Sequence, residues 1–233
     1  MNILITGATK GIGKKLAEIL SNEHLIFASG RNEEILKTYD NYCKCDLSNT
    51  NELKKLGEYI ESHNIDVLIN NAGEYVYNPI DKVDYSQISR IVSVNLNAPI
   101  FLISKAVPYM KQQKWGRIIN IGSISGVMGE AGASLYSASK SVLIGGTKAI
   151  ALELAEYGIT VNTINPGWVE TEMGNSSAEE GNWSKEEILS TIPERRFITP
   201  DEIAGMVRYL ISKEAMGVTG QSINICAGLS VGC

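Results

Sequence analysis

Residues 2–13 of the chain read NILITGATKGIG, and this stretch decides the fold. Its first five residues form a short apolar run of the kind that makes a buried strand. Three glycines follow with the spacing Gly7-x-x-x-Gly11-x-Gly13, and an amphipathic segment covers residues 11–22. Glycine allows a tight turn and a close backbone approach to a phosphate, and a helix N-terminus offers free N–H groups. The stretch therefore predicts a strand, a phosphate-binding turn and a helix, although a purely structural tight turn would show a similar pattern.

The rest of the chain alternates short apolar runs with longer amphipathic segments. Strands are expected at 2–6, 24–29, 41–45, 65–70, 116–122, 159–165 and 221–225, and helices at 11–22, 49–63, 85–114, 133–157 and 200–212. Runs such as 67–69 and 118–121 are apolar on both faces, which is typical of parallel strands covered on both sides. This alternation predicts a single α/β domain over residues 1–233, a doubly wound, Rossmann-like parallel sheet of about seven strands flanked by helices.

Two segments depart from the regular pattern. Residues 172–198 contain Gly174, Gly181 and Trp183, with a short possible helix at 184–191. A long irregular segment in a compact domain is often a lid, so we expect a substrate lid here, with a plain surface excursion as the alternative. The connection between strands 24–29 and 41–45 is also short, which predicts a trimmed helix.

Composition and charge exclude several classes of function. The net charge of −5 argues against nucleic acid as a partner, since such a partner requires a basic surface. We expect no membrane span, because no uninterrupted apolar stretch approaches the length of about 18 residues that one needs. The N-terminus runs directly into the first strand, so no signal peptide is expected and a cytoplasmic location is the default.

The cysteines and histidines do not predict a metal site. Cys43 and Cys45 form a single Cys-x-Cys pair with no second pair, and Cys226 and Cys233 lie near the C-terminal end. The histidines, His24 and His63, are isolated from each other and from the cysteines. We therefore expect free thiols and no metal, and no Ser-His-Asp hydrolase chemistry.

Charges near the glycine turn predict which dinucleotide binds. In NAD-selective folds an acid at the end of the second strand binds the ribose hydroxyls, but here that strand ends Ser29-Gly30-Arg31. Arg31 and Lys10 suit a 2′-phosphate, so NADPH is expected, with two solvated surface charges as the alternative. The turn residues expected to contact the cofactor are Gly7, Thr9, Lys10, Gly11, Ile12 and Gly13.

A candidate acid–base pair lies on the helix expected at 133–157. The i, i+4 spacing of Tyr136 and Lys140 puts both side chains on one face, one turn apart. A nearby ammonium lowers the pKa of a phenol from about 10 and makes it a usable general acid. Ser123 follows strand 116–122 at the end where active sites of such sheets gather, so its hydroxyl is placed to hold a carbonyl oxygen.

These elements together resemble the short-chain dehydrogenase/reductase family over nearly the whole chain. The matching elements are Thr6-Gly7-x-x-x-Gly11-Ile12-Gly13, Asp46, Asn70-Asn71-Ala72-Gly73, Asn95, Ser123, Tyr136-x-x-x-Lys140 and Pro166-Gly167-x-x-x-Thr171. The resemblance implies that Tyr136 gives its proton to the carbonyl oxygen, which Ser123 orients. It also implies that Lys140 binds the nicotinamide ribose and lowers the pKa of Tyr136, and that Asn95 holds a water linking Lys140 to solvent.

The same resemblance implies further cofactor and substrate contacts. Asp46 and Leu47 would meet the adenine, Asn71, Ala72 and Gly73 would line the cofactor, and Val169 and Thr171 would meet the carboxamide. Ser125, Trp168 and Met173 are expected beside the substrate together with Ser123 and Tyr136. Structural alternatives stay open for four members: Asn70 and Asn71 as ties between strands, Asn95 as an ordinary helical residue, and Ser125 as a turn residue.

Within the family, the chain is most similar to bacterial 3-oxoacyl-[acyl-carrier-protein] reductases and polyketide ketoreductases. That similarity implies reduction of a 3-oxoacyl thioester, with an acyl carrier protein as a possible partner and a homotetramer built through segments 85–114 and 133–157. One departure is Tyr157, preceded by Glu156, at a position that is usually basic, which leaves Lys114 as the nearby cation. The alternatives are a reductase of another small ketone, such as a sugar-derived, polyketide or cyclic intermediate, and a non-catalytic NADPH-binding regulator.

Overall fold

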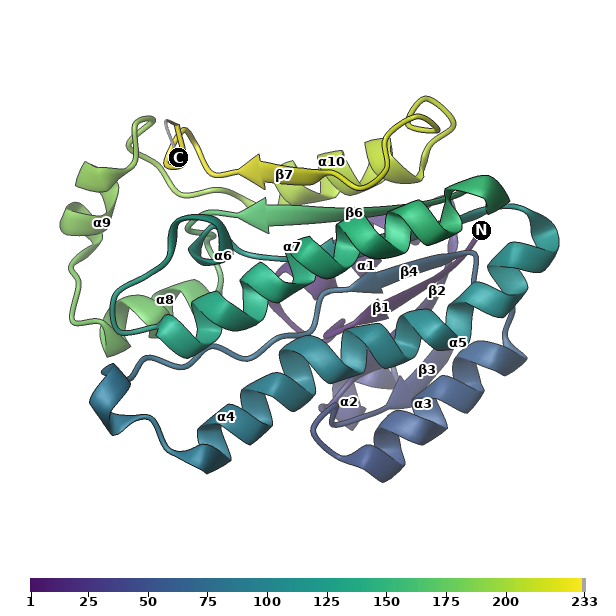
Figure 1. The fold of residues 1–233 in the computed structure, drawn as a ribbon, viewed down its shortest axis with the longest axis horizontal. Helices are drawn as coiled ribbons and strands as arrows, with labels where there is room; N and C mark the ends of the chain where they lie inside the picture. Colours follow the sequence, from purple (N-terminus) through teal and green to yellow (C-terminus); the bar gives the residue numbers. More distant parts are fainter. Residues whose placement is uncertain (232–233) are drawn as a thin grey trace.

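The computed structural model describes residues 1–231 and shows one seven-stranded sheet with helices on both faces (Figure 1). The strands are β1 (Asn2–Thr6), β2 (Leu25–Gly30), β3 (Asn41–Lys44), β4 (Val67–Asn70), β5 (Gly116–Ile121), β6 (Ile159–Pro166) and β7 (Ser222–Ile225). Every neighbouring pair is parallel, in the order β3-β2-β1-β4-β5-β6-β7. The predicted fold class and strand set are confirmed.

The strand order places the binding site. The chain adds β2 and β3 on one side of β1 and then crosses to β4 on its other side, so the order reverses next to β1. A crevice opens at such a reversal, beyond the carboxyl ends of the strands. The glycine turn follows β1, so it lies at this crevice.

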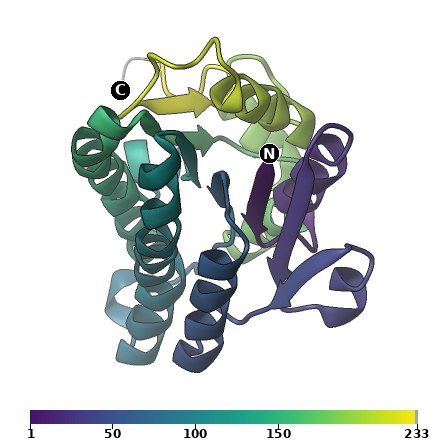
Figure 2. The same ribbon diagram turned by 90° about the vertical axis from the view of Figure 1, so that its right-hand side faces the viewer.

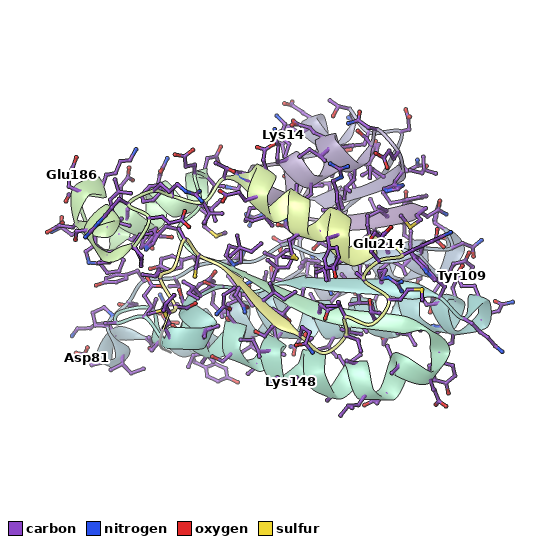
Figure 3. The ribbon with its side chains drawn as sticks, turned by 90° about the horizontal axis from the view of Figure 1, so that it is seen from above. Lys14, Asp81, Tyr109, Lys148, Glu186 and Glu214 are labelled. Atoms are coloured by element: carbon purple, nitrogen blue, oxygen red, sulfur yellow. The ribbon has the colours of Figure 1, made fainter. Side chains whose placement is uncertain are left out.

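Two layers of helices cover the sheet and build a core on each face (Figure 2). On one face α1 (Gly11–Leu20) packs against α10 (Pro200–Ile211), and residues such as Leu16 and Ile203 are fully buried there. On the other face lie α3 (Thr50–Ser62), α5 (Ala98–Gln113) and α7 (Ser134–Leu154). The charged side chains labelled Lys14, Lys148 and Glu186 are exposed and point outward (Figure 3).

The long helix expected at 85–114 is interrupted. It consists of α4 (Tyr85–Val92), a π-helical turn (Ser93–Asn97) and α5. Pro99 has no N–H to donate to the carbonyl four residues earlier, that of Asn95, which favours a wider turn at this point. Asn95 therefore lies in the irregular turn and not in regular helix.

The same stretch bears on the expectation that the chain has no membrane span. By length and hydropathy alone, Tyr85–Gln113 is one helix that passes the test for a membrane span, with a window of mean hydropathy 1.4. Of that window, 44% is buried within the fold. The mean hydropathy of this window is high because many apolar residues are spread among polar ones, without an uninterrupted apolar run. Because the apolar face packs on the sheet and on α3, this helix is a core element of the fold.

The remaining segments differ from expectation mainly in helix content. The connection after β2 carries only α2 (Glu33–Leu36), as the short spacing predicted. The segment 172–198 contains α8 (Glu172–Glu180) and α9 (Lys185–Thr191), whereas only the second was expected. Thr171 caps α8 by accepting a hydrogen bond from the N–H of Gly174, and Ser184 caps α9. The short helix α6 (Ser125–Met128) and two 3₁₀ turns, at Ile80–Lys82 and Ala155–Tyr157, complete the helical elements of residues 1–231.

Candidate active site

A cleft of about 480 Å³ opens at the carboxyl ends of β1, β4, β5 and β6. It is lined by every predicted cofactor, catalytic and substrate residue except Gly13 and Asn95. Gly13 lies under the turn, where a Cβ atom would collide with the Gly7 carbonyl and the Asn71 side chain. Asn95 lies behind the cleft wall. A cleft of this size, at this place in the sheet, suits an extended ligand such as a dinucleotide.

The glycine turn is held open by Asn71. Gly7 and Gly11 have φ angles of +68° and +52°, in the left-handed region that other residues rarely adopt. The Asn71 side chain donates to the carbonyls of Thr6 and Gly7 at 2.9 and 3.3 Å. Its neighbour Asn70 donates to Asn120 at 2.9 Å, joining β4 to β5. Both asparagines therefore tie strands and turn together, as the structural alternative expected, and Asn71 also lines the cleft.

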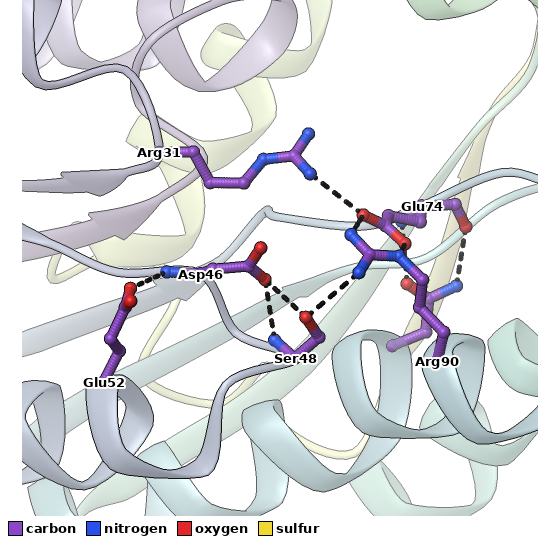
Figure 4. Close-up of polar contacts among 7 residues, drawn as sticks. Arg31, Asp46, Ser48, Glu52, Glu74 and Arg90 are labelled. Atoms are coloured by element: carbon purple, nitrogen blue, oxygen red, sulfur yellow. Dashed lines mark hydrogen bonds and ion pairs between the residues drawn. The ribbon is translucent and has the colours of Figure 1, made fainter. Parts of the chain in front are cut away.

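The two cations at the adenine end each have a carboxylate partner. Lys10 pairs with Glu172 at 3.1 Å. Arg31 pairs with Glu74 at 3.2 Å, as Figure 4 shows. The end of β2 has no acid, as expected, and the carboxylate partners of both cations come from remote parts of the chain. The Arg31 side chain remains 59% exposed, so its guanidinium still presents a free edge to the cleft.

The Glu74 carboxylate binds two arginines that come from different elements of the fold. It accepts hydrogen bonds from Arg90 on α4 as well as from Arg31 (Figure 4). Close by, Asp46 accepts from the N–H and hydroxyl of Ser48 at 2.9 and 2.7 Å. Burial disfavours the Asp46 carboxylate, but these hydrogen bonds and the charges of Arg90 and Arg31 outweigh it and hold its pKa below the usual value. Asp46 therefore faces the cleft as a carboxylate and as a hydrogen-bond acceptor.

Tyr136, Lys140 and Ser123 meet at the inner end of the cleft. They are 8%, 4% and 9% exposed, respectively. The Lys140 ammonium donates to the carbonyl of Ile121 at 2.9 Å and lies 5.7 Å from the centre of the Tyr136 ring. Burial lowers the pKa of Lys140 to about 8. The i, i+4 spacing on α7 and the carboxyl end of β5 thus bring the three predicted groups together.

The protonation of Tyr136 differs from expectation. Burial raises the pKa of Tyr136 to about 12, while the Ser123 hydroxyl acts to lower it and the Glu130 carboxylate to raise it further. The effect expected from the spacing to Lys140 is a lower pKa. Desolvation prevails because the phenol is enclosed and the ammonium is directed at the Ile121 carbonyl. Tyr136 is therefore held as the neutral phenol, the form that can donate a proton.

Asn95 is fully buried and its side chain is hydrogen-bonded to protein. Its oxygen accepts from the N–H of Glu74 at 2.9 Å, and its amide donates to the Glu74 carbonyl at 2.9 Å and to the Ser139 hydroxyl at 3.0 Å. Ser139 in turn donates to the Tyr136 carbonyl at 2.7 Å. Asn95 thus braces the loop after β4 against α7, and its role in holding a water stays a prediction.

The substrate end contains polar residues that sequence reasoning missed. Glu130 accepts hydrogen bonds from the hydroxyls of Ser125 and Tyr75, at 2.6 and 2.7 Å. Ser125 is therefore more than a turn residue. Two sequence positions could have indicated this pair. Tyr75 lies two residues after the Asn-Asn-Ala-Gly motif, and Glu130 lies between Ser123 and Tyr136.

Aromatic and apolar side chains form the outer wall of the substrate end. Trp168 meets Trp183 edge to face, with ring centres 5.8 Å apart. Met173, at the start of α8, lines the same cleft and is 39% exposed. The predicted substrate residues Trp168 and Met173 therefore lie at the cleft, together with Trp183 from the connection between α8 and α9.

The cysteines that the structure describes are free thiols. Cys45 and Cys226 are buried, and burial raises the pKa of Cys45 to about 12, which keeps it protonated. Cys233 lies outside the described residues. Within residues 1–231, no group of three or more His, Cys, Asp or Glu side chains is placed to hold a metal ion.

Comparison with known proteins identifies the family. A family model for short chain dehydrogenases matches residues 1–182, so the chain belongs to this family of oxidoreductases, which act on CH–OH and C=O groups. A 3-oxoacyl-[acyl-carrier-protein] reductase of Rickettsia bellii, FabG, is 38% identical over 97% of this chain and 95% of its own.

Two solved structures share the whole fold. One is YwfH, an NADPH-dependent reductase involved in bacilysin biosynthesis, with a TM-score of 0.93, 27% identity and coverage of 100% of this chain and 99% of the other. The second is a single-site variant of the actinorhodin polyketide ketoreductase with NADPH, with a TM-score of 0.92, 35% identity and coverage of 99% and 97%. The predicted family is thereby confirmed.

Proposed function

We propose that the chain reduces a ketone to a secondary alcohol with NADPH, and that its substrate is a 3-oxoacyl thioester. The observation that carries the proposal is the meeting of Tyr136, Ser123 and Lys140 at the inner end of a cleft with a dinucleotide-binding turn. The 3-oxoacyl substrate is supported by the similarity to the reductase of Rickettsia bellii.

The mechanism follows from the side chains. When bound, the nicotinamide cofactor supplies the hydride. The Ser123 hydroxyl, which donates to Ser125 in this structure, would turn to donate a hydrogen bond to the ketone oxygen and hold it beside Tyr136. The Tyr136 hydroxyl, kept protonated by burial, gives its proton to that oxygen as charge develops on it, and the Lys140 ammonium stabilises the resulting phenolate.

The cleft residues fit the cofactor. The left-handed glycines leave room at the turn for a pyrophosphate, and a Cβ at Gly13 would push against the Gly7 carbonyl and Asn71 and distort this turn. Arg31 and Lys10 would hold the 2′-phosphate, each exchanging a carboxylate partner for it. The end of β2 has no acid to favour NADH. Asp46 and Leu47 would face the adenine, and Val169 and Thr171 the carboxamide.

The proposal also covers a substrate lid, a partner protein, the oligomeric state and the cellular location of the enzyme. Segment 172–198 would act as a substrate lid, since residues of α8 and α9 line the cleft. An acyl carrier protein would meet Lys111 and Lys114, with the Lys111 ammonium 4.2 Å from the centre of the Tyr157 ring. A homotetramer would cover exposed apolar side chains on α5 and α7, such as Leu152, which is 85% exposed. The enzyme would work in the cytoplasm.

The direct test mixes the protein with NADPH and acetoacetyl-CoA, an acetoacetyl carrier protein or a free ketone, and follows the loss of nicotinamide absorbance. The same screen with NADH measures the cofactor preference. Reduction of the thioesters supports the proposal, whereas reduction of free ketones alone favours another small ketone. NADPH binding without any turnover would support the regulator instead.

A further inference from the structure

The Glu130 carboxylate lies next to the reacting groups. It belongs to the loop between α6 and α7, and it accepts hydrogen bonds from Ser125 and from Tyr75. Ser125 in turn accepts one from the Ser123 hydroxyl at 3.2 Å. A chain of hydrogen bonds therefore joins Glu130 to Ser123, the residue that orients the ketone oxygen.

The loop and the ring of Tyr75 fix this carboxylate in place. Gly129 and Gly132 flank it, both with φ of +79°, so the backbone turns sharply on either side of Glu130. The Tyr75 ring packs edge to face on Tyr136, with centres 5.0 Å apart. The pKa of the Tyr75 hydroxyl is raised by burial and by Glu130, so this hydroxyl stays a donor. Glu130 is thus aimed at the substrate end of the cleft.

The Glu130 carboxylate can accept further hydrogen bonds and has no cationic partner among residues 1–231. Within residues 1–231, no Lys, Arg or His nitrogen forms an ion pair with it. Each carboxylate oxygen accepts one hydrogen bond here and has a further lone pair. A half-buried carboxylate without a cation is costly, and two hydroxyls offset only part of that cost.

We propose that Glu130, Tyr75 and Ser125 form a subsite for a protonated amine, so that, among ketones of equal shape, one with an ammonium group near the carbonyl is reduced with the higher kcat/KM. An ammonium offers up to three donors and a positive charge, which match the free lone pairs and the unpaired charge of Glu130. The Tyr75 ring, whose hydroxyl is hydrogen-bonded to Glu130, also lines the cleft, and an aromatic face favours a cation over a neutral group. The inference rests on the proposed ketone reduction and adds to it a preference for a cationic substituent near the ketone.

The test uses a matched pair of ketones, 4-aminocyclohexanone and 4-methylcyclohexanone, with NADPH. They share shape and carbonyl and differ in the charge of one substituent. In the unchanged protein, kcat/KM should favour the amine. In Glu130→Gln, which keeps the shape and removes the charge, the ratio of kcat/KM for the amine over the methyl ketone should fall at least about tenfold.

A matched control removes a different negative charge. Glu58 is exposed on α3 and does not line the cleft, so Glu58→Gln should leave the ratio unchanged. An equal fall of the ratio in Glu58→Gln and Glu130→Gln would indicate a general charge effect and overturn the subsite. An equal change for both ketones in Glu130→Gln would also overturn it, since Glu130 would then act on Tyr136 and not on the substrate.

A binding measurement separates this inference from the proposed reaction. Ligand-observed NMR of the two ketones with the NADP⁺ complex needs no turnover. Binding of the amine that weakens in Glu130→Gln supports the subsite even where no ketone, including acetoacetyl-CoA, is reduced, in which case only the reaction fails. Equal binding of both ketones to both proteins overturns the subsite even where reduction of acetoacetyl-CoA is observed.

Discussion

Arg31 donates a hydrogen bond to the Glu74 carboxylate at 3.2 Å, joining the end of β2 to the loop after β4 across the mouth of the cleft (Figure 4). Because the main chain of Glu74 also holds the Asn95 side chain, this ion pair links the adenine end of the cleft to the turn beside α7. Arg31, the cation expected to bind the 2′-phosphate, is therefore paired with the Glu74 carboxylate in this structure.

Substitution of Arg31 tests the cofactor preference. Arg31→Asp removes the guanidinium and introduces an acid at the position that binds ribose hydroxyls in NAD-selective folds. The ratio of kcat/KM for NADPH over NADH should fall by at least about a hundredfold, because a charged hydrogen bond is replaced by repulsion. Steady-state kinetics with both cofactors measure this ratio, and an unchanged ratio would remove Arg31 from the 2′-phosphate site.

Substitution of Glu74 should act in the opposite direction. Glu74→Gln leaves the backbone contacts to Asn95 intact and frees Arg31 from its ion pair. The KM for NADPH should fall about three- to tenfold while that for NADH changes little, since surface pairs of this kind contribute up to about 1 kcal/mol. Glu61→Gln, which breaks the remote pair with Lys105, is the control and should leave both values unchanged. A rise in the NADPH KM for Glu74→Gln would contradict this account.

The pH dependence of reduction should follow Lys140. Its pKa is lowered to about 8 by burial, so its ammonium prevails below that pH and is lost as the pH rises through it. The Tyr136 phenol, with its pKa raised to about 12, stays protonated over the same range. The value of kcat/KM should therefore be level below about pH 7 and fall above about pH 8. A profile that stays level to about pH 10 would show that the charge of Lys140 is not needed.

Replacing two glycines by alanine compares the backbone geometry of the cofactor-binding turn with that of an ordinary helix. Gly13→Ala places a methyl group against the Gly7 carbonyl, so it should lower the free energy of unfolding by about 1–3 kcal/mol and weaken NADPH binding. Gly205→Ala, on α10, meets nothing within 4 Å and should raise that free energy by about 0.5–1 kcal/mol. Urea unfolding of both variants checks the contrast, and equal effects would argue against a special geometry at Gly13.

Much of the fold and site followed from local patterns. Strands such as β1 and β4 are apolar runs bounded by turn residues, and parallel strands carry the residues after them to a shared edge. That is why Gly7, Ser123 and Val169, which lie on three different connections, were expected in one cleft and line it. The i, i+4 spacing likewise placed Tyr136 beside Lys140.

What could not be predicted depends on contacts between remote segments. Glu74 is 43 residues from Arg31, and Glu172 is 162 residues from Lys10, so no local pattern pairs them. The pKa of Tyr136 depends on enclosure by several elements, and a spacing rule that considers only Lys140 gives the wrong direction. Helix α8 has little apolar periodicity, and its start is marked mainly by the Thr171 cap.

The central claim is that Tyr136 donates the proton in an NADPH-dependent reduction of a ketone. Tyr136→Phe removes only the hydroxyl and keeps the ring that packs on Tyr75. The most direct measurement compares kcat for acetoacetyl-CoA in the two proteins, with NADPH binding followed by nucleotide fluorescence. We predict a loss in kcat of about a hundredfold or more with unchanged NADPH affinity. A variant that keeps more than about a tenth of the kcat would contradict the assignment.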